Sequence, residues 1–231
     1  ETFRSTDGGD TWEQVLEGPN FVSMEFHPAD PNIIYAATTG NSKFYKSTDN
    51  GQTWANVTNG SGLPNSGRNR GLVGVTPSNP NVVYVLYSAN DDGFGGLYKS
   101  VDQGINFELQ SEFPNIFGWD VDGSDEGGQG WYDLALAISP TNENIVFVGG
   151  VNCWKSTNSG QDWQISSHWY GAQGTEYAHA DQHMLRFNEN GILFSGNDGG
   201  LYKTSNLGDS WQDISDGLQI TQNYKIGISQ T

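Results

Sequence analysis

The segment His179-Ala-Asp-Gln-His183 concentrates side chains that can bind metal ions or move protons. On an extended strand His179, Asp181 and His183 would share one face, because side chains alternate between the faces of a strand. Same-face neighbours are about 6.6–6.8 Å apart, so two of them could hold one metal ion, and a zinc site would need a further ligand from another segment. Alternatively, Asp181 could orient a histidine that acts as a general base. A third interpretation is that the segment only hydrogen-bonds the surrounding loops.

Asp133 is the carboxylate that we expect to act together with Asp181. Glycoside hydrolysis needs two carboxyl groups, about 5–5.5 Å apart for retention of configuration or about 6.5–9.5 Å apart for inversion. Both residues lie shortly before an apolar run that is typical of a strand, and the two runs belong to consecutive repeats of the chain. Asp133 and Asp181 are therefore the candidate catalytic pair.

Other polar and aromatic residues also precede these apolar runs. They differ from one repeat to the next, while the rest of each repeat stays similar. Such variation in one layer of a regular repeat indicates where a specific site would be built. Aromatic rings there could stack on sugar rings or pack the loops down. The candidate ligand-binding residues are Arg68, Asn69, Arg70, Trp131, Tyr132, His179 and His183.

The segment 117–131 carries clustered carboxylates among glycines. Oxygen ligands on such a loop suit Ca²⁺, although their order does not match the EF-hand pattern. A solvated acidic loop is the alternative, and the sequence indicates no other cofactor. The candidate calcium ligands are Asp120, Asp122, Asp125 and Glu126.

A ten-residue pattern occurs five times in the chain. It reads aromatic-(Lys/Arg)-(Ser/Thr)-x-(Asp/Asn)-x-Gly-x-x-(Trp/Phe), and it begins at Phe3, Tyr45, Tyr98, Trp154 and Tyr202. The Asp or Asn side chain can accept backbone N–H groups across a tight turn, and the Gly permits a positive φ. The final aromatic ring can pack beneath the turn. We therefore expect a structural role for Asp7, Asp49, Asp102, Asn158 and Asn206.

Two apolar runs lie before each turn from the second onward, for example Met24-Glu-Phe-His-Pro and Asn32-Ile-Ile-Tyr-Ala-Ala. With the strands on either side of the turn, each repeat holds four short strands. A repeated four-stranded unit of about 40–55 residues is typical of a β-propeller blade. One blade cannot cover both of its faces, so neighbouring blades must stack around an axis. The predicted fold class is therefore all-β, a β-propeller of antiparallel blades.

The repeat also sets the expected boundaries. We expect a hairpin at 1–17, blades at about 18–57, 58–110, 111–166 and 167–215, and the opening strand of a further blade at 216–231. This is either an open arc or part of a larger propeller. We expect a fragment of a longer chain that carries additional domains.

The repeated turn resembles the Asp-box, or bacterial neuraminidase repeat, of sialidases, sortilin-type receptors and xyloglucanase-like glycosidases. In those families the Asp-box lies on the periphery, away from the functional site. The His-Ala-Asp-Gln-His segment and the run Gly196-Asn-Asp-Gly-Gly-Leu-Tyr202 resemble large secreted bacterial proteins described as sortilin-like or glycosidase-like. Many of these use type IX secretion. The resemblance implies an extracellular or cell-surface location.

Composition excludes several functions. The chain has 231 residues, with 10 Lys and Arg against 27 Asp and Glu, and a net charge of −17. Such acidity opposes binding to nucleic-acid phosphates and to anionic lipid. No apolar stretch is long enough for membrane insertion, and one cysteine allows no intrachain disulfide. Arginines near the candidate site are too few for sialidase chemistry.

Two functions remain open. The first is a secreted or cell-surface binding module that recognises a glycan or a protein through the face at the channel mouth. The second is a glycoside hydrolase that acts on a polysaccharide with paired carboxylates. The sequence leaves open whether the protein is an enzyme.

Overall fold

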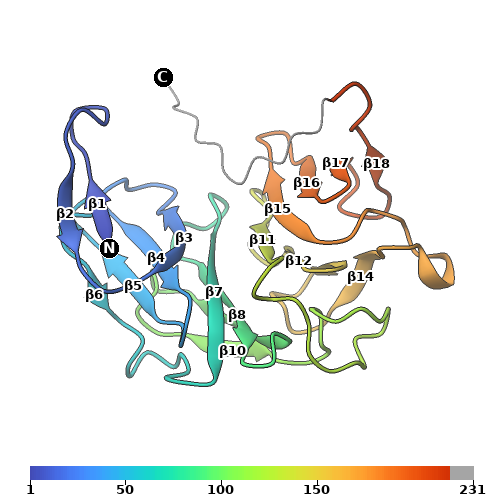
Figure 1. The fold of residues 1–231 in the computed structure, drawn as a ribbon, viewed down its shortest axis with the longest axis horizontal. Helices are drawn as coiled ribbons and strands as arrows, with labels where there is room; N and C mark the ends of the chain where they lie inside the picture. Colours follow the sequence, from blue (N-terminus) through green and yellow to red (C-terminus); the bar gives the residue numbers. More distant parts are fainter. Residues whose placement is uncertain (219–231) are drawn as a thin grey trace.

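The computed structural model describes residues 1–218, so the strand expected at 216–231 lies almost wholly outside the described residues. Residues 1–218 form one two-stranded sheet and four four-stranded antiparallel sheets. Each four-stranded sheet consists of strands that follow one another in the sequence, and each is one blade (Figure 1). The predicted all-β propeller of four-stranded blades is confirmed. This part of the chain contains no helix of the length and apolarity that a membrane crossing requires.

The strands are short, and most are separated by tight turns. The hairpin comprises β1 (Thr2–Arg4) and β2 (Glu13–Leu16). Blade 1 comprises β3 (Phe21–Phe26), β4 (Ile34–Thr38), β5 (Phe44–Ser47) and β6 (Ala55–Asn56). Blade 2 comprises β7 (Arg68–Val75), β8 (Val83–Ala89), β9 (Phe94–Ser100) and β10 (Glu108–Ser111). Blade 3 comprises β11 (Ala135–Ile138), β12 (Val146–Gly149), β13 (Cys153–Ser156) and β14 (Gln164–Ser167). Blade 4 comprises β15 (Gln182–Phe187), β16 (Leu193–Asn197), β17 (Gly200–Thr204) and β18 (Gln212–Asp213), and a 3₁₀ turn (Ala172–Gly174) precedes it.

The apolar core lies between consecutive blades. Strand β8 shows this best, because its side chains alternate between two interfaces. Val83, Val85 and Tyr87 join the cluster shared with blade 1, whereas Tyr84 and Leu86 join the cluster shared with blade 3. A central strand that is buried on both faces reads as a continuous apolar run, as Val82–Tyr87 does.

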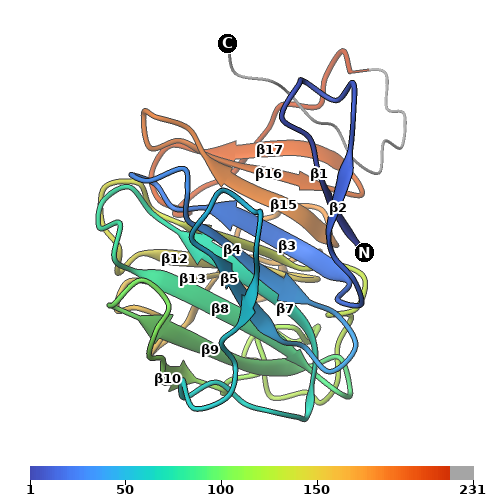
Figure 2. The ribbon, with the colours of Figure 1, turned by 90° about the vertical axis from the view of Figure 1, so that its left-hand side faces the viewer.

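The first strand of each blade lies nearest the central axis. Contacts run from β3 to β7, from β7 to β11 and from β11 to β15. Across the axis, burial raises the pKa of the Glu25 carboxyl in β3, and the Arg186 guanidinium in β15 opposes this shift. Blades 1 and 4 therefore face one another at their inner strands. Figure 2 shows the sheets from the side, with the β1–β2 hairpin next to blade 1.

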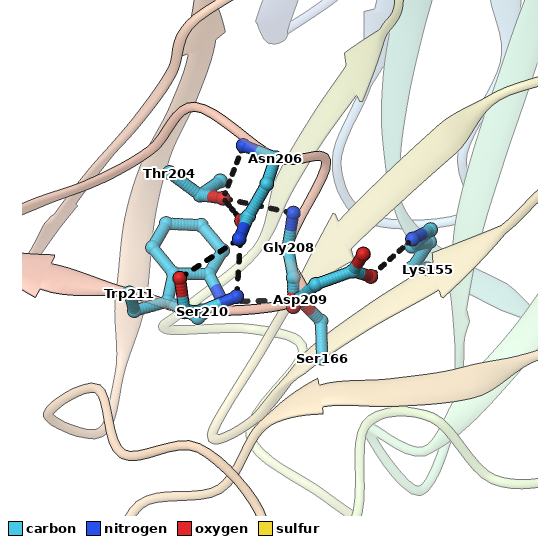
Figure 3. A network of polar contacts seen from close by, with 8 residues as sticks. All are labelled: Lys155, Ser166, Thr204, Asn206, Gly208, Asp209, Ser210 and Trp211. Atoms are coloured by element: carbon cyan, nitrogen blue, oxygen red, sulfur yellow. Dashed lines mark hydrogen bonds and ion pairs between the residues drawn. The ribbon is translucent and has the colours of Figure 1, made fainter.

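The repeated turn forms a closed set of hydrogen bonds, which Figure 3 shows for blade 4. The Thr204 hydroxyl accepts the N–H of Gly208 and donates to Asn206 Oδ1, which in turn accepts the N–H of Ser210. Equivalent bonds link the Ser and Asp or Asn of the other turns to the same backbone positions. The side-chain and backbone bonds from Thr53 contribute most to lowering the pKa of Asp49 to about 2.

The same turns also join neighbouring blades. Trp211 Nε1 donates to the Ser166 hydroxyl in β14 of blade 3, and that hydroxyl donates to the carbonyl of Gly208 (Figure 3). The basic residue before the turn reaches in the opposite direction: Lys155 of blade 3 contacts Asp209 in the turn of blade 4. Arg4, Lys46 and Lys99 make corresponding bonds to Asn50, Gln103 and Ser159 of the next turn. Each turn is therefore fastened to its own blade and to the preceding one.

We predict that replacing Gly160 by Ala destabilises the protein more than replacing Gly191. Both glycines have positive φ, +86° and +76°, so a Cβ adds backbone strain of about 1–2 kcal/mol at either position. At Gly160 the Cβ would also collide with Leu97 of blade 2, whereas at Gly191 no atom lies within 4 Å. We therefore expect Gly160→Ala to cost about 1–3 kcal/mol more. Urea unfolding of both variants measures the difference, and equal losses would contradict the interlocking of blades at this turn.

Candidate functional site

Side chains from three blades meet around the first residues of β7, the loop before β11, the start of β15 and the turn between β16 and β17. We call this group the rim cluster and define it as Arg70, Tyr132, Asp133, Asp181, His183 and Asp198. The Arg70 guanidinium donates to the carbonyls of Trp131 and Tyr132, at 3.1 Å each. The Tyr132 hydroxyl donates to Asp198 Oδ2 at 3.2 Å, and His183 Nε2 lies 2.7 Å from Asp198 Oδ1. The cluster therefore connects blades 2, 3 and 4.

Asp133 is the most unusual member of the rim cluster. It is only 1% exposed, and neither carboxyl oxygen has a hydrogen-bond donor within residues 1–218. Burial and, to a smaller extent, the neighbouring charge of Asp181 together raise its pKa to about 8, while Arg70 opposes the shift. Two ionised carboxylates are both acceptors, so Asp133 and Asp181 can share a hydrogen bond only when one of them is protonated.

The backbone of Asp181 has a conformation that residues other than glycine seldom adopt. Its φ is +65°, in the left-handed region, and it lies directly before the first residue of β15. Its carboxylate accepts a hydrogen bond from Gln129 Nε2 at 3.3 Å, which ties blade 4 to the loop before β11. Backbone strain of this kind costs about 1–3 kcal/mol and persists where the surrounding structure enforces it.

The prediction of an extended strand over residues 179–183 is wrong for residues 179–181. Strand β15 begins at Gln182, and a bulge lies between Gln182 and Met184. The turn at Asp181 breaks the alternation, so His179, Asp181 and His183 do not share one strand face. His179 instead lies against Gly199 and contacts the carbonyl of Ala180.

The other predicted ligand residues divide into two groups. Tyr132 and Trp131 form an aromatic row with His183, with ring centroids 5.4 Å apart for Trp131–Tyr132 and 5.0 Å apart for Tyr132–His183. Trp131 is 61% exposed and is the open end of this row. Arg68 and Asn69 point to other partners, Glu112 at 3.4 Å and Asp92 at 3.0 Å. These two residues border the rim cluster without joining it.

The carboxylates of the acidic loop mainly contact their own loop, and the calcium site stays a prediction. Within residues 1–218, no group of three or more His, Cys, Asp or Glu side chains is arranged to hold a metal ion. Asp125 accepts the N–H of Trp119 at 2.6 Å, and Asp122 accepts that of Ser124 at 3.1 Å. Asp120 and Asp122 line a cavity of about 460 Å³ beside Tyr170. These carboxylates therefore shape their own loop.

Two residues that contribute to this site, Gln129 and Asp198, were not predicted as site residues from the sequence. Gln129 has no distinguishing motif, and its contact with Asp181 depends on how blades 3 and 4 pack. Asp198 lies in the tight turn Asn197-Asp-Gly-Gly200 between β16 and β17. The Asn, Asp and Gly residues of this turn predict a tight loop. They do not predict that the Asp198 carboxylate contacts Tyr132 and His183.

The stability of the protein should fall as pH rises from about 4 to about 8, and Asp133→Asn should remove this loss. The folded-state pKa of Asp133, about 8, lies above the ordinary aspartate pKa of 3.8, so between these values the folded state holds a proton that the unfolded state releases. Asparagine mimics the protonated acid and does not ionise. The stability of the variant relative to the natural chain should therefore rise between pH 4 and pH 8, by at most about 5 kcal/mol at about 1.36 kcal/mol per pKa unit. Urea unfolding at both pH values measures the gain. A pH-independent difference would contradict the raised pKa.

The fold is similar to that of several solved proteins. The GH74 enzyme of Niastella koreensis aligns with a TM-score of 0.63 and 17% identity, over 92% of this chain and 34% of that protein. The GH74 xyloglucanase of Xanthomonas campestris aligns with a TM-score of 0.61 and 19% identity, over 89% and 32%. YCF48 bound to a D1 peptide aligns with a TM-score of 0.57 and 13% identity, over 86% and 56%. The chain therefore spans between about a third and little more than half of the length of these proteins. Identities this low show the fold alone.

No curated protein sequence matches the chain. Its sequence does match the profile of the Sortilin-Vps10 family, described as "Sortilin, neurotensin receptor 3", over residues 1–144. This match covers more than half of the chain and includes three of the five repeated turns. The resemblance that the repeats indicated is thereby confirmed at the level of the family, and the chain belongs to the Sortilin-Vps10 family.

Proposed function

We propose that this chain is a binding module of an extracellular or cell-surface protein, and that it recognises a protein or glycan ligand through the rim cluster. The observation that carries the proposal is Asp133, a buried carboxyl group with no donor within the described residues. An unpaired buried polar group costs free energy, and it is retained where a ligand or a proton satisfies it.

The surroundings of Asp133 support a contact surface. Trp131 is largely exposed, and the side chains of His183 and Asp198 are each 39% exposed. Exposed aromatic residues beside fixed polar groups are typical of specific interfaces, because the ring supplies area and the polar groups supply orientation. The similar fold of YCF48, which was solved with a D1 peptide bound, is compatible with a protein ligand.

A glycoside hydrolase is the alternative. A carboxylic acid that stays protonated near neutral pH beside a second carboxylate is what general-acid catalysis requires. The burial of Asp133 is less favourable, because a general acid must reach the oxygen of the bond that is cleaved and this carboxyl group is only 1% exposed. Glycosidase carboxylates also flank the scissile bond, about 5–9.5 Å apart. The burial of Asp133 therefore favours binding over hydrolysis.

Location and assembly stay predictions. Membership of the Sortilin-Vps10 family favours a domain on the extracellular side. Type IX secretion and further domains in the same polypeptide rest on the resemblance to large secreted bacterial proteins.

We predict that the chain binds members of a polysaccharide and peptide panel without cleaving them. Asp181→Ala should weaken such binding by about tenfold, equivalent to about 1.4 kcal/mol, because it removes a partly exposed carboxylate of the rim cluster. Glycan and peptide arrays measure binding, and reducing-sugar release measures hydrolysis. Asp120→Asn, on the acidic loop, is the control and should bind normally. Cleavage that disappears in both Asp181→Ala and Asp133→Asn would establish the hydrolase instead.

A further inference from the structure

The rim cluster holds more negative charge than its basic groups neutralise. Asp133, Asp181 and Asp198 lie within it, whereas Arg70 is its only arginine or lysine, and Arg70 also donates to two backbone carbonyls. Asp198 has His183 as its basic neighbour. The carboxyl pair of Asp133 and Asp181 therefore lacks a full counter-charge, and it lacks donors for the oxygens of Asp133 within residues 1–218.

Two kinds of species can satisfy such a pair: a proton or a cation. The proton adds only one donor to the one that Gln129 Nε2 already gives to Asp181. A divalent metal ion fits poorly, because no third His, Cys, Asp or Glu side chain in the described residues completes the group and the Arg70 guanidinium lies close by. A primary ammonium group carries one charge and three donors, which matches two carboxylates and the neighbouring Gln129 amide oxygen.

We propose that the Asp133–Asp181 pair receives a primary ammonium group of a protein ligand, a lysine side chain or an N-terminal amine. This inference rests on the proposed binding function of the rim cluster. The ammonium takes the place of the proton that the pair holds. The ligand enters with its three N–H bonds intact, and the proton of the Asp133 carboxyl leaves to solvent, so the charge of the complex equals that of the free protein.

The rest of the rim cluster suits a lysine side chain. The approach is through Asp181, which is partly exposed, since Asp133 itself is buried. Trp131 and Tyr132 present an apolar edge on which the four-carbon stem of a lysine can lie, with its charged end beyond. The net charge of −17 also attracts a basic partner and speeds its encounter.

The affinity should depend on pH through the groups that face the pair. These are Asp181 itself before β15, Arg70 from β7, and the Tyr132, His183 and Asp198 set from the loop before β11 and from blade 4. Raising pH toward 8 removes the competing proton from Asp133 and should strengthen binding of the ammonium. Lowering pH to 6 should weaken it for the same reason.

Isothermal titration calorimetry with blocked tetralysine as the probe tests the inference. Titrations at pH 7 in two buffers of different ionisation enthalpy count the protons released on binding. We expect close to one proton per bound peptide, and fully acetylated tetralysine should bind at least about tenfold more weakly. Asp133→Asn leaves the net charge at neutral pH unchanged, because asparagine resembles the protonated acid. It should nevertheless abolish proton release and weaken binding about tenfold.

Asp120→Asn is the matched control for general attraction to an acidic protein. It removes one charge outside the rim cluster and should retain both the affinity and the proton release of the natural chain. No binding of tetralysine, or equal binding to the natural chain and Asp133→Asn with no proton released, would overturn the ammonium site. Either result leaves the proposed binding function intact if arrays still show a ligand that depends on Asp181, and that function fails only if they show none.

Discussion

The burial of each sheet between two neighbours is the interaction on which the rest of this structure depends. Strand β8 presents Val83 and Val85 to one blade and Tyr84 and Leu86 to the other, and all four side chains are fully buried. Short strands with so few ladder bonds cannot be stable alone, so the blades stabilise one another as the units of a repeat protein do. The repeated turns add polar contacts between blades at the outer edge, where the side chains of Trp211 and Lys155 each contact a residue of the neighbouring blade.

Because the contacts between blades and the turns supply the stability, the rim cluster can contain energetically unfavourable features. The positive φ of Asp181 and the buried carboxyl group of Asp133, which has no donor within residues 1–218, both cost free energy. Both residues lie where three blades converge. The apolar clusters between the blades hold the segments before β7, β11 and β15 in place independently of the polar side chains at the rim. The rim residues are consequently available for recognition, while the uniform turns remain at the periphery.

Repetition made much of the fold predictable. Spacing of aromatic, Ser, Asp and Gly residues indicated the turns around Asp7 and Asn206, because those hydrogen bonds lie within a few residues of sequence. Short continuous apolar runs, such as Val82–Tyr87, indicated strands that are buried on both faces. The inter-blade bonds of Lys99 and Trp163 were not predictable, since their partners belong to the next or preceding repeat and their distance depends on how the blades stack.

The sequence by itself determined the blades, the turns and the segments that precede the inner strands, because these follow from local alternation and from short-range hydrogen bonds. It also singled out Asp133 and Asp181 as members of consecutive repeats. Only the tertiary structure decided that Asp133 is buried where the charge of Asp181 acts on it, that Asp181 has a positive φ and that His179 lies outside the rim cluster. Those outcomes depend on the packing of blade 3 against blade 4, which brings side chains from distant segments within hydrogen-bond distance of one another and which no local pattern encodes.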